Sequence, residues 1–179
     1  MRTSVRALAA AVAATLLSLT SAIAHAEPAV PADGCRDISF PVPQGTLATT
    51  LCLPPGGAAD TVMVLMSGSN FNGTYWDFQY QPEIYNFRRA MNAAGYATLV
   101  ADRLGNGASS TPVSLSLTAT ATAEALHGMV RALRDGLDGA RPFTKVVTVG
   151  HSLTSGTSVM EANSYHDVDG VLLTVVAMR

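Results

Sequence analysis

Ser152 stands where a strand-like run gives way to a helix, and a serine in that position can act as a nucleophile. The apolar run at residues 145–149 predicts the strand, and a helix is expected from just behind Ser152 to about residue 164. On such a tight turn the hydroxyl is exposed above the sheet, and the strained backbone requires small neighbours, which Gly150 provides. A hydroxyl held in this way can attack a carbonyl carbon.

Two backbone N–H groups are candidates for stabilising the oxyanion that this attack produces. The helix behind the serine offers the N–H of Leu153. A second N–H is expected from the loop after an earlier strand, and the loop at residues 67–69 follows the apolar run at 61–66. We therefore predict an oxyanion hole formed by Leu153 and Ser69.

The segments that must position these groups alternate between strand and helix. Strands are expected at residues 61–66, 97–101, 145–149 and 171–176. Helices are expected at residues 82–94, 119–135 and 153–164. Two further strands, at residues 38–42 and 47–53, flank a Pro-Gln-Gly turn and predict an N-terminal hairpin. The fold class is therefore α/β, with a mostly parallel sheet, flanking helices and an antiparallel hairpin at one edge.

Three motifs, taken in order, resemble the N-terminal part of a secreted α/β-hydrolase. Residues 149–152 (Val-Gly-His-Ser) resemble the nucleophile elbow, and residues 67–69 (Ser-Gly-Ser) resemble the oxyanion loop. Residues 102–109 resemble the Asp-x-x-Gly-x-Gly-x-Ser loop of that family. The resemblance extends over about residues 38–176. It implies a serine hydrolase that acts on a small-molecule ester or related acyl substrate.

The sequence also departs from the family pattern. Thr154 stands where Gly-x-Ser-x-Gly has its last glycine, and we expect this β-branched residue to cost about 1–3 kcal/mol in strain. The family's acid and histidine follow later strands, whereas this chain ends at Arg179. His127, His151 and His166 are not expected to replace that base. The expectation is therefore an incomplete α/β-hydrolase fold with impaired turnover, and the alternative is a truncated, non-catalytic binding or interaction protein.

The amino terminus predicts export from the cell. Arg2 and Arg6 precede an apolar stretch that ends in Ala-His-Ala at residue 26, which is typical of a cleaved secretory signal peptide at residues 1–26. An uncleaved anchor helix is the alternative. Residues 27–34 are expected to form a flexible leader, and residues 35–179 the hydrolase-like domain. The predicted location is secreted, or extracellular.

Cys35 and Cys52 are the two cysteines of the chain, and each lies near the end of a strand-like run. In an oxidising compartment, an even number of cysteines favours a disulfide between them. Closing a loop of this size would stabilise the fold by about 3 kcal/mol. Two buried thiols are the alternative.

Composition and spacing argue against several classes of partner. The net charge of −2 offers no basic excess for nucleic acid. No run after residue 30 approaches the roughly 20 apolar residues of a membrane span, so no membrane contact is expected after signal cleavage. The spacing of histidine and cysteine predicts no metal site, and the Gly-Asn-Gly at residues 105–107 lacks the third glycine of a dinucleotide loop. We therefore expect no metal and no cofactor.

Several other residues have structural interpretations. His127 is expected to be a structural residue in mid-helix, and Asp167 and Asp169 to be solvated acids in a turn. Arg88 is expected on the solvent face of its helix. The apolar run at residues 171–176 is expected to form an exposed sheet edge, through which the chain could associate with itself.

Overall fold

A computed structural model of the chain describes residues 34–175. The signal peptide predicted at residues 1–26 lies outside the described residues, as does nearly all of the predicted leader. Residues 176–179 lie outside them as well.

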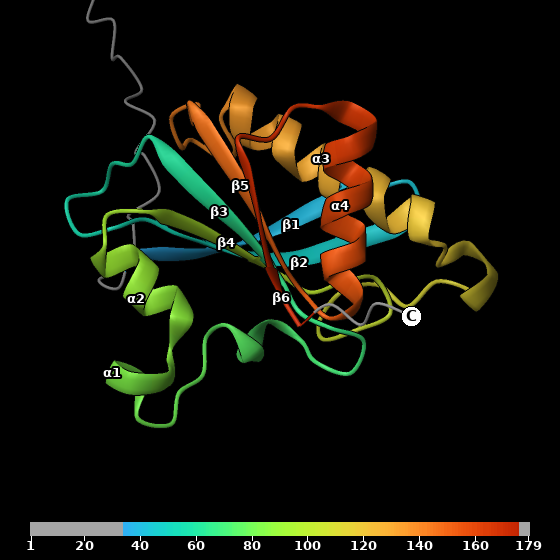
Figure 1. Cartoon of the computed structure of the whole chain (residues 1–179), viewed down its shortest axis with the longest axis horizontal. Helices are drawn as coiled ribbons and strands as arrows, with labels where there is room; N and C mark the ends of the chain where they lie inside the picture. The colour runs from blue at the N-terminus through green and yellow to red at the C-terminus, as the bar shows by residue number, and fades with distance from the viewer. Residues whose placement is uncertain (1–33, 176–179) are drawn as a thin grey trace, which may run out of the picture.

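A six-stranded sheet with the order β1-β2-β4-β3-β5-β6 forms the centre of the molecule (Figure 1). The strands are β1 (Cys35–Val42), β2 (Gly45–Cys52), β3 (Thr61–Met66), β4 (Ala97–Ala101), β5 (Lys145–His151) and β6 (Gly170–Thr174). Strand β2 is antiparallel to both β1 and β4, and the other pairings are parallel. The α/β class and the antiparallel hairpin at the edge are thereby confirmed.

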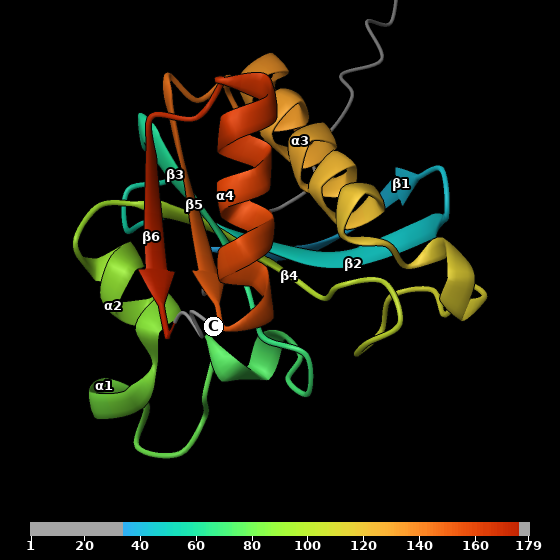
Figure 2. The same cartoon turned by 45° about the vertical axis from the view of Figure 1, so that its right-hand side comes forward.

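Helices cover the sheet on both sides (Figure 2). The helices α3 (Ala119–Asp135) and α4 (Leu153–Tyr165) lie side by side on one face. The helices α1 (Pro82–Tyr85) and α2 (Phe87–Ala93) lie on the other. Alternate residues of β3 belong to different cores: Val62 and Val64 pack in the core beneath α3, and Met63 packs in the core that α2 covers. A parallel strand buried on both faces is expected to be continuously apolar, as β3 is.

One predicted helix is divided in two. The sequence predicts a single helix over residues 82–94, but Asn86 has an extended backbone (φ −93°, ψ 99°) between α1 and α2. Its side-chain oxygen accepts a 2.8 Å hydrogen bond from the Arg89 N–H, which caps α2. Its side-chain nitrogen donates a 2.6 Å bond to Asp77 Oδ1. Asparagine favours such caps over a helix interior because its side chain competes for backbone hydrogen bonds.

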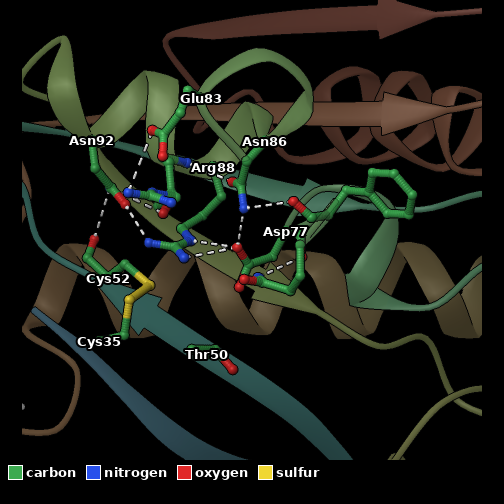
Figure 3. A network of polar contacts seen from close by, with 12 residues as sticks. Cys35, Thr50, Cys52, Asp77, Glu83, Asn86, Arg88 and Asn92 are labelled. Atoms are coloured by element: carbon green, nitrogen blue, oxygen red, sulfur yellow. Dashed lines mark hydrogen bonds and ion pairs between the residues drawn. A yellow bond between two sulfur atoms is a disulfide. The ribbon is translucent and has the colours of Figure 1, made fainter. Parts of the chain in front are cut away.

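The expectation that Arg88 faces solvent is wrong. Its guanidinium lies 2.7 Å from Asp77 Oδ1, and the side chain is only 11% exposed (Figure 3). In the same network, the side-chain nitrogen of Asn92 donates to the main-chain oxygen of Cys52. The contacts therefore join the loop before α1, helix α2 and the end of β2, which are separate segments whose proximity the local sequence does not show.

The predicted disulfide is confirmed, with Cys35 bonded to Cys52. The two residues are direct partners in the antiparallel register of β1 and β2. Next to them, the Leu53 N–H donates a 2.9 Å hydrogen bond to the Gly34 carbonyl. The crosslink therefore closes the open end of the N-terminal hairpin.

Strand β6 lies at the edge of the described sheet. Three of its apolar side chains, Val171, Leu172 and Leu173, remain 38–39% exposed. Self-association through this strand stays a prediction. Among residues 34–175, no helix combines the length and the apolar character needed to cross a membrane.

Replacing both Cys35 and Cys52 with serine is expected to lower the free energy of unfolding by about 3 kcal/mol, because the unfolded hairpin regains the freedom that the crosslink removes. Urea denaturation of the variant and of the unreduced chain measures the difference. Adding a reductant to the serine variant should have no further effect. An unchanged denaturation midpoint would contradict a structural role for the disulfide.

Candidate active site

Ser152 occupies the single-residue turn between β5 and α4, with φ 54° and ψ −113°. A positive φ is costly for a non-glycine residue and persists only where the surroundings impose it. Here the Ser152 N–H donates a 3.0 Å bond to the Thr174 carbonyl, and the Ser152 carbonyl accepts a 3.0 Å bond from the Ser155 N–H. The side chain is exposed. The turn is therefore fixed by hydrogen bonds on both sides of an exposed serine residue.

Gly150 allows this turn because it has no side chain. A Cβ at this position would overlap the main-chain carbonyl of Thr154 and come within 2.6 Å of the Ser155 nitrogen. The first turn of α4 therefore packs directly against the end of β5. This close approach is the physical reason for the glycine two residues before the serine.

Thr154 occupies the position of the last glycine in the family's motif, and its hydroxyl is hydrogen-bonded there. Its side chain is fully buried, and its backbone φ is negative. The hydroxyl donates a 2.7 Å bond to the Met66 carbonyl and accepts a 2.9 Å bond from the His151 N–H. The threonine hydroxyl thus satisfies two backbone groups at the ends of neighbouring strands. The expected strain stays a prediction, and these two hydrogen bonds are favourable contacts that the sequence reasoning did not consider.

The loop after β3 lies against the turn. A Cβ on Gly68 would come within 3.2 Å of the Ser152 Cβ and 3.1 Å of the His151 ring. Ser69 is the next residue, so its N–H is close to this contact. Neither the Ser69 N–H nor the Leu153 N–H donates a hydrogen bond to any residue between 34 and 175. The structure therefore places the Gly68 backbone against Ser152, and leaves the Ser69 and Leu153 N–H groups without partners among the described residues. That these two groups form an oxyanion hole stays a prediction.

Two side chains of the loop after β4 hold the loop that carries Ser69. The Arg103 guanidinium donates a 2.6 Å bond to the Ser69 carbonyl. The Asn106 side chain donates a 2.7 Å bond to the Phe71 carbonyl and a 3.3 Å bond to that of Ser69. Burial lowers the pKa of Arg103, which remains charged at neutral pH. Because the Ser69 carbonyl is fixed in this way, the orientation of its loop is fixed too.

Asp102 organises both of these loops. Its carboxylate accepts a 2.6 Å bond from the Gly73 N–H and a 2.8 Å bond from the Ala108 N–H. Gly107 lies so close to this carboxylate that a Cβ there would overlap it. The motif at residues 102–109 therefore serves to hold the two loops together around the Asp102 carboxylate. The sequence pattern indicated where the motif lies but not this role.

A group of aromatic side chains lies beside the turn. The His151 ring stacks on Tyr75 with centroids 4.4 Å apart, and its Nδ1 lies 3.1 Å from the Tyr75 hydroxyl and 3.2 Å from Thr174 Oγ1. An apolar pocket of about 610 Å³ adjoins these residues. Its lining includes Phe71, Tyr75, Phe78, Tyr85 and Thr174. The ring of His151, next to the serine, is thus held by its contacts with Tyr75 and Thr174.

No side chain in the described part of the chain hydrogen-bonds the Ser152 hydroxyl. His127 lies instead on α3, with Nδ1 3.0 Å from Asp167 Oδ2. The expectation that Asp167 is a solvated acid is therefore wrong. Burial, together with the neighbouring Asp167 carboxyl, raises the pKa of Glu161 to about 8. His127, Glu161 and Asp167 lie together although they come from separate segments, so local spacing does not reveal their proximity. The expectation of no metal site stays a prediction.

A family model agrees with the strand-turn-helix geometry. Residues 63–178 match the model of the alpha/beta hydrolase family. This chain belongs to the alpha/beta hydrolase family. The match begins within β3 and includes both the Ser69 loop and the Ser152 turn. No curated protein sequence matches the chain.

Solved structures of this family share the fold. An epoxide hydrolase from an endophytic Streptomyces is 22% identical, with a TM-score of 0.61 and 82% of this chain covered. A bacterial membrane phospholipase A is 19% identical, with a TM-score of 0.61 and 81% covered. A thioesterase domain from the curacin biosynthetic pathway is 15% identical, with a TM-score of 0.62 and 81% covered. The present alpha/beta hydrolase chain spans 38%, 41% and 48% of those three chains, in that order.

Two glycines of this alpha/beta hydrolase provide a matched test of the elbow. Gly150→Ala is expected to destabilise the fold by about 1–3 kcal/mol or more, because its methyl group would displace the first turn of α4. Gly156→Ala lies in α4, where the added Cβ would meet no atom within 4 Å beyond the helix's own nearby backbone, and should be neutral or stabilise by up to about 1 kcal/mol. Thermal and urea unfolding measure both variants. Equal effects would contradict the close approach at Gly150.

Proposed function

We propose that this chain is part of an exported serine hydrolase in which Ser152 attacks an ester or a related acyl substrate. The observation that carries the proposal is the exposed Ser152 on a turn of positive φ, next in the chain to Leu153 and in contact range of the loop that carries Ser69. The backbone N–H groups of Leu153 and Ser69 have no partner among the described residues. This arrangement is what nucleophilic attack on a carbonyl requires.

The proposed reaction forms a bond between Ser152 Oγ and the substrate carbonyl carbon. The carbonyl electron pair moves to the oxygen, which becomes an oxyanion. The N–H groups of Leu153 and Ser69 stabilise that charge, and removing one such donor typically slows an acyl-transfer enzyme by about 10²–10³-fold. Collapse of the tetrahedral intermediate releases the alcohol or thiol and leaves an acyl group on Ser152. Water then hydrolyses the acyl-enzyme.

The proton of the Ser152 hydroxyl needs a base, which the family resemblance places after a later strand. No histidine between residues 34 and 175 hydrogen-bonds this hydroxyl. Loss of the base typically costs a serine hydrolase several orders of magnitude in rate, although an oxyanion hole preserves part of the catalysis. We therefore propose that this chain reacts through Ser152 but hydrolyses esters weakly.

The aromatic pocket suggests the kind of acyl compound. Its lining is mostly apolar, and two of its residues, Tyr75 and Thr174, contact the histidine next to Ser152. We propose that it takes an apolar part of the substrate, since burial of apolar surface is favourable. The similar structures named as a phospholipase A and a thioesterase are consistent with an acyl substrate.

The proposed export rests on two features. The amino-terminal sequence has the form of a cleaved signal peptide. The Cys35–Cys52 disulfide is of the kind that persists in oxidising compartments.

Labelling with a fluorophosphonate tests the nucleophile, because this reagent phosphonylates an activated serine. We expect the unaltered chain to label at least about tenfold faster than Ser152→Ala, given the size of oxyanion-hole effects. Ser164→Ala is the matched control, since Ser164 is an exposed serine of the same helix. It should label like the unaltered chain. Equal labelling of the unaltered chain and Ser152→Ala would overturn the proposal.

The alternative function is a non-catalytic binding or interaction protein. The absence of a histidine on the Ser152 hydroxyl, within the described residues, favours it. A short-chain p-nitrophenyl ester distinguishes the two. Slow hydrolysis that Ser152→Ala abolishes supports the enzyme, whereas hydrolysis that Ser152→Ala leaves unchanged, together with unchanged labelling, supports the alternative.

A further inference from the structure

A second group of ionisable side chains lies away from Ser152, between α3, α4 and the loop that follows α4. His127 Nδ1 lies 3.0 Å from Asp167 Oδ2 and 3.6 Å from Glu161 Oε1. One ligand atom from each of these three residues lies within 4.8 Å of the others. Three residues from three segments of the chain thus direct their polar atoms toward one point.

Glu161 is the most unusual member of this group. Its side chain is fully buried, and neither of its carboxylate oxygens has a hydrogen-bond partner among the described residues. Asp167 Oδ1 is also buried without such a partner. A buried carboxylate that lacks a donor is costly, and coordination of a metal ion is one of the established ways to compensate for it.

Neighbouring residues fix the group from outside. The Tyr165 ring stacks on the His127 ring, with centroids 3.6 Å apart and an interplanar angle of 8°. Arg134, two turns along α3 from His127, donates a 2.8 Å hydrogen bond to the main-chain oxygen of Asp167. It also pairs with Asp169 at 2.6 Å. The imidazole plane and the loop that carries Asp167 are therefore both held in place, as ligands are by the supporting residues of metal sites.

We propose that His127, Glu161 and Asp167 bind a divalent transition-metal ion, with Zn²⁺ as the best match. Ligand atoms held 2.0–2.1 Å from a tetrahedral zinc ion are about 3.3 Å apart. The distances of 3.0 Å and 3.6 Å from His127 Nδ1 lie on either side of this value. An imidazole nitrogen with two carboxylates suits zinc, whereas calcium prefers six to eight oxygen ligands.

The site is structural rather than catalytic. Glu161 is nine residues after Ser152 in the sequence, which corresponds to about 13 Å along the axis of α4. His127 and Asp167 are 22% and 27% exposed, so the ion can enter from solvent and keep water as its fourth ligand. Zinc would join the middle of α3 to the end of α4, the helix that begins behind the proposed nucleophile. This role goes beyond the proposed function and does not depend on it.

Isothermal titration of the chelator-treated chain with ZnCl₂ tests the site. We expect one zinc ion per chain and a melting temperature that rises with zinc concentration. Glu161→Gln keeps nearly the same shape but removes the charge, and it should weaken zinc binding by at least about tenfold. Loss of a residue that only supports a metal ligand already lowers metal affinity by about 10–100-fold. His127→Asn should have a similar effect. Because this variant keeps the buried Glu161, it tests the site even where Glu161→Gln does not fold.

Two variants serve as matched controls. Glu124→Gln removes an exposed carboxylate from α3, and His166→Asn removes an exposed imidazole next to α4 from a left-handed position that asparagine tolerates. Both should bind zinc like the unaltered chain. The proposal is overturned if the unaltered chain gives no zinc binding, if Glu161→Gln and His127→Asn bind as well as the controls, or if CaCl₂ binds as tightly as ZnCl₂. Absence of any zinc binding would indicate that the two carboxyl groups share a proton instead.

Discussion

The direct contact between the end of β5 and the first turn of α4 is the constraint on which the candidate site depends. It exists because Gly150 has no side chain to separate them. With the helix so close, the connecting residue must turn sharply, and Ser152 adopts a positive φ. The backbone strain is offset by the hydrogen bond to Thr174 and by the buried hydroxyl of Thr154, which joins the ends of β3 and β5. The exposure of the serine hydroxyl is thus a consequence of how the helix packs.

The other part of the candidate site is the loop after β3 that carries Ser69, and contacts with the loop after β4 hold it in place. Gly68 lies close to Ser152, and the carbonyl of the next residue, Ser69, is bound from the loop after β4 by Arg103 and Asn106. That loop is in turn shaped around the Asp102 carboxylate. Parallel strands make this possible because their carboxyl ends meet at one edge of the sheet. The groups that would perform chemistry are short backbone segments, and the charged residues around them act as supports.

The sequence predicted those features that depend on local patterns. The continuous apolar runs located β3, β4 and β5, and the Gly-x-Ser spacing located the turn, since burial on two faces and a tight backbone each restrict the residue types allowed. It did not predict features that arise between distant segments. The side chain of Asn86, which divides a helix, is bound by Asp77, and the hydroxyl of Thr154 donates to the Met66 carbonyl. Likewise, Glu161 shows its unusual environment only when α3 and α4 are packed together.

The claim at the centre of this account is that the Ser152 hydroxyl and two main-chain amides converge on one reacting carbonyl. A crystal structure of the chain after reaction with a fluorophosphonate measures this directly. The account predicts a bond from phosphorus to Ser152 Oγ, with the phosphonyl oxygen about 2.7–3.1 Å from the nitrogens of both Leu153 and Ser69. A phosphonyl oxygen turned toward solvent and remote from both nitrogens, or a phosphonate carried by a different residue, would contradict it.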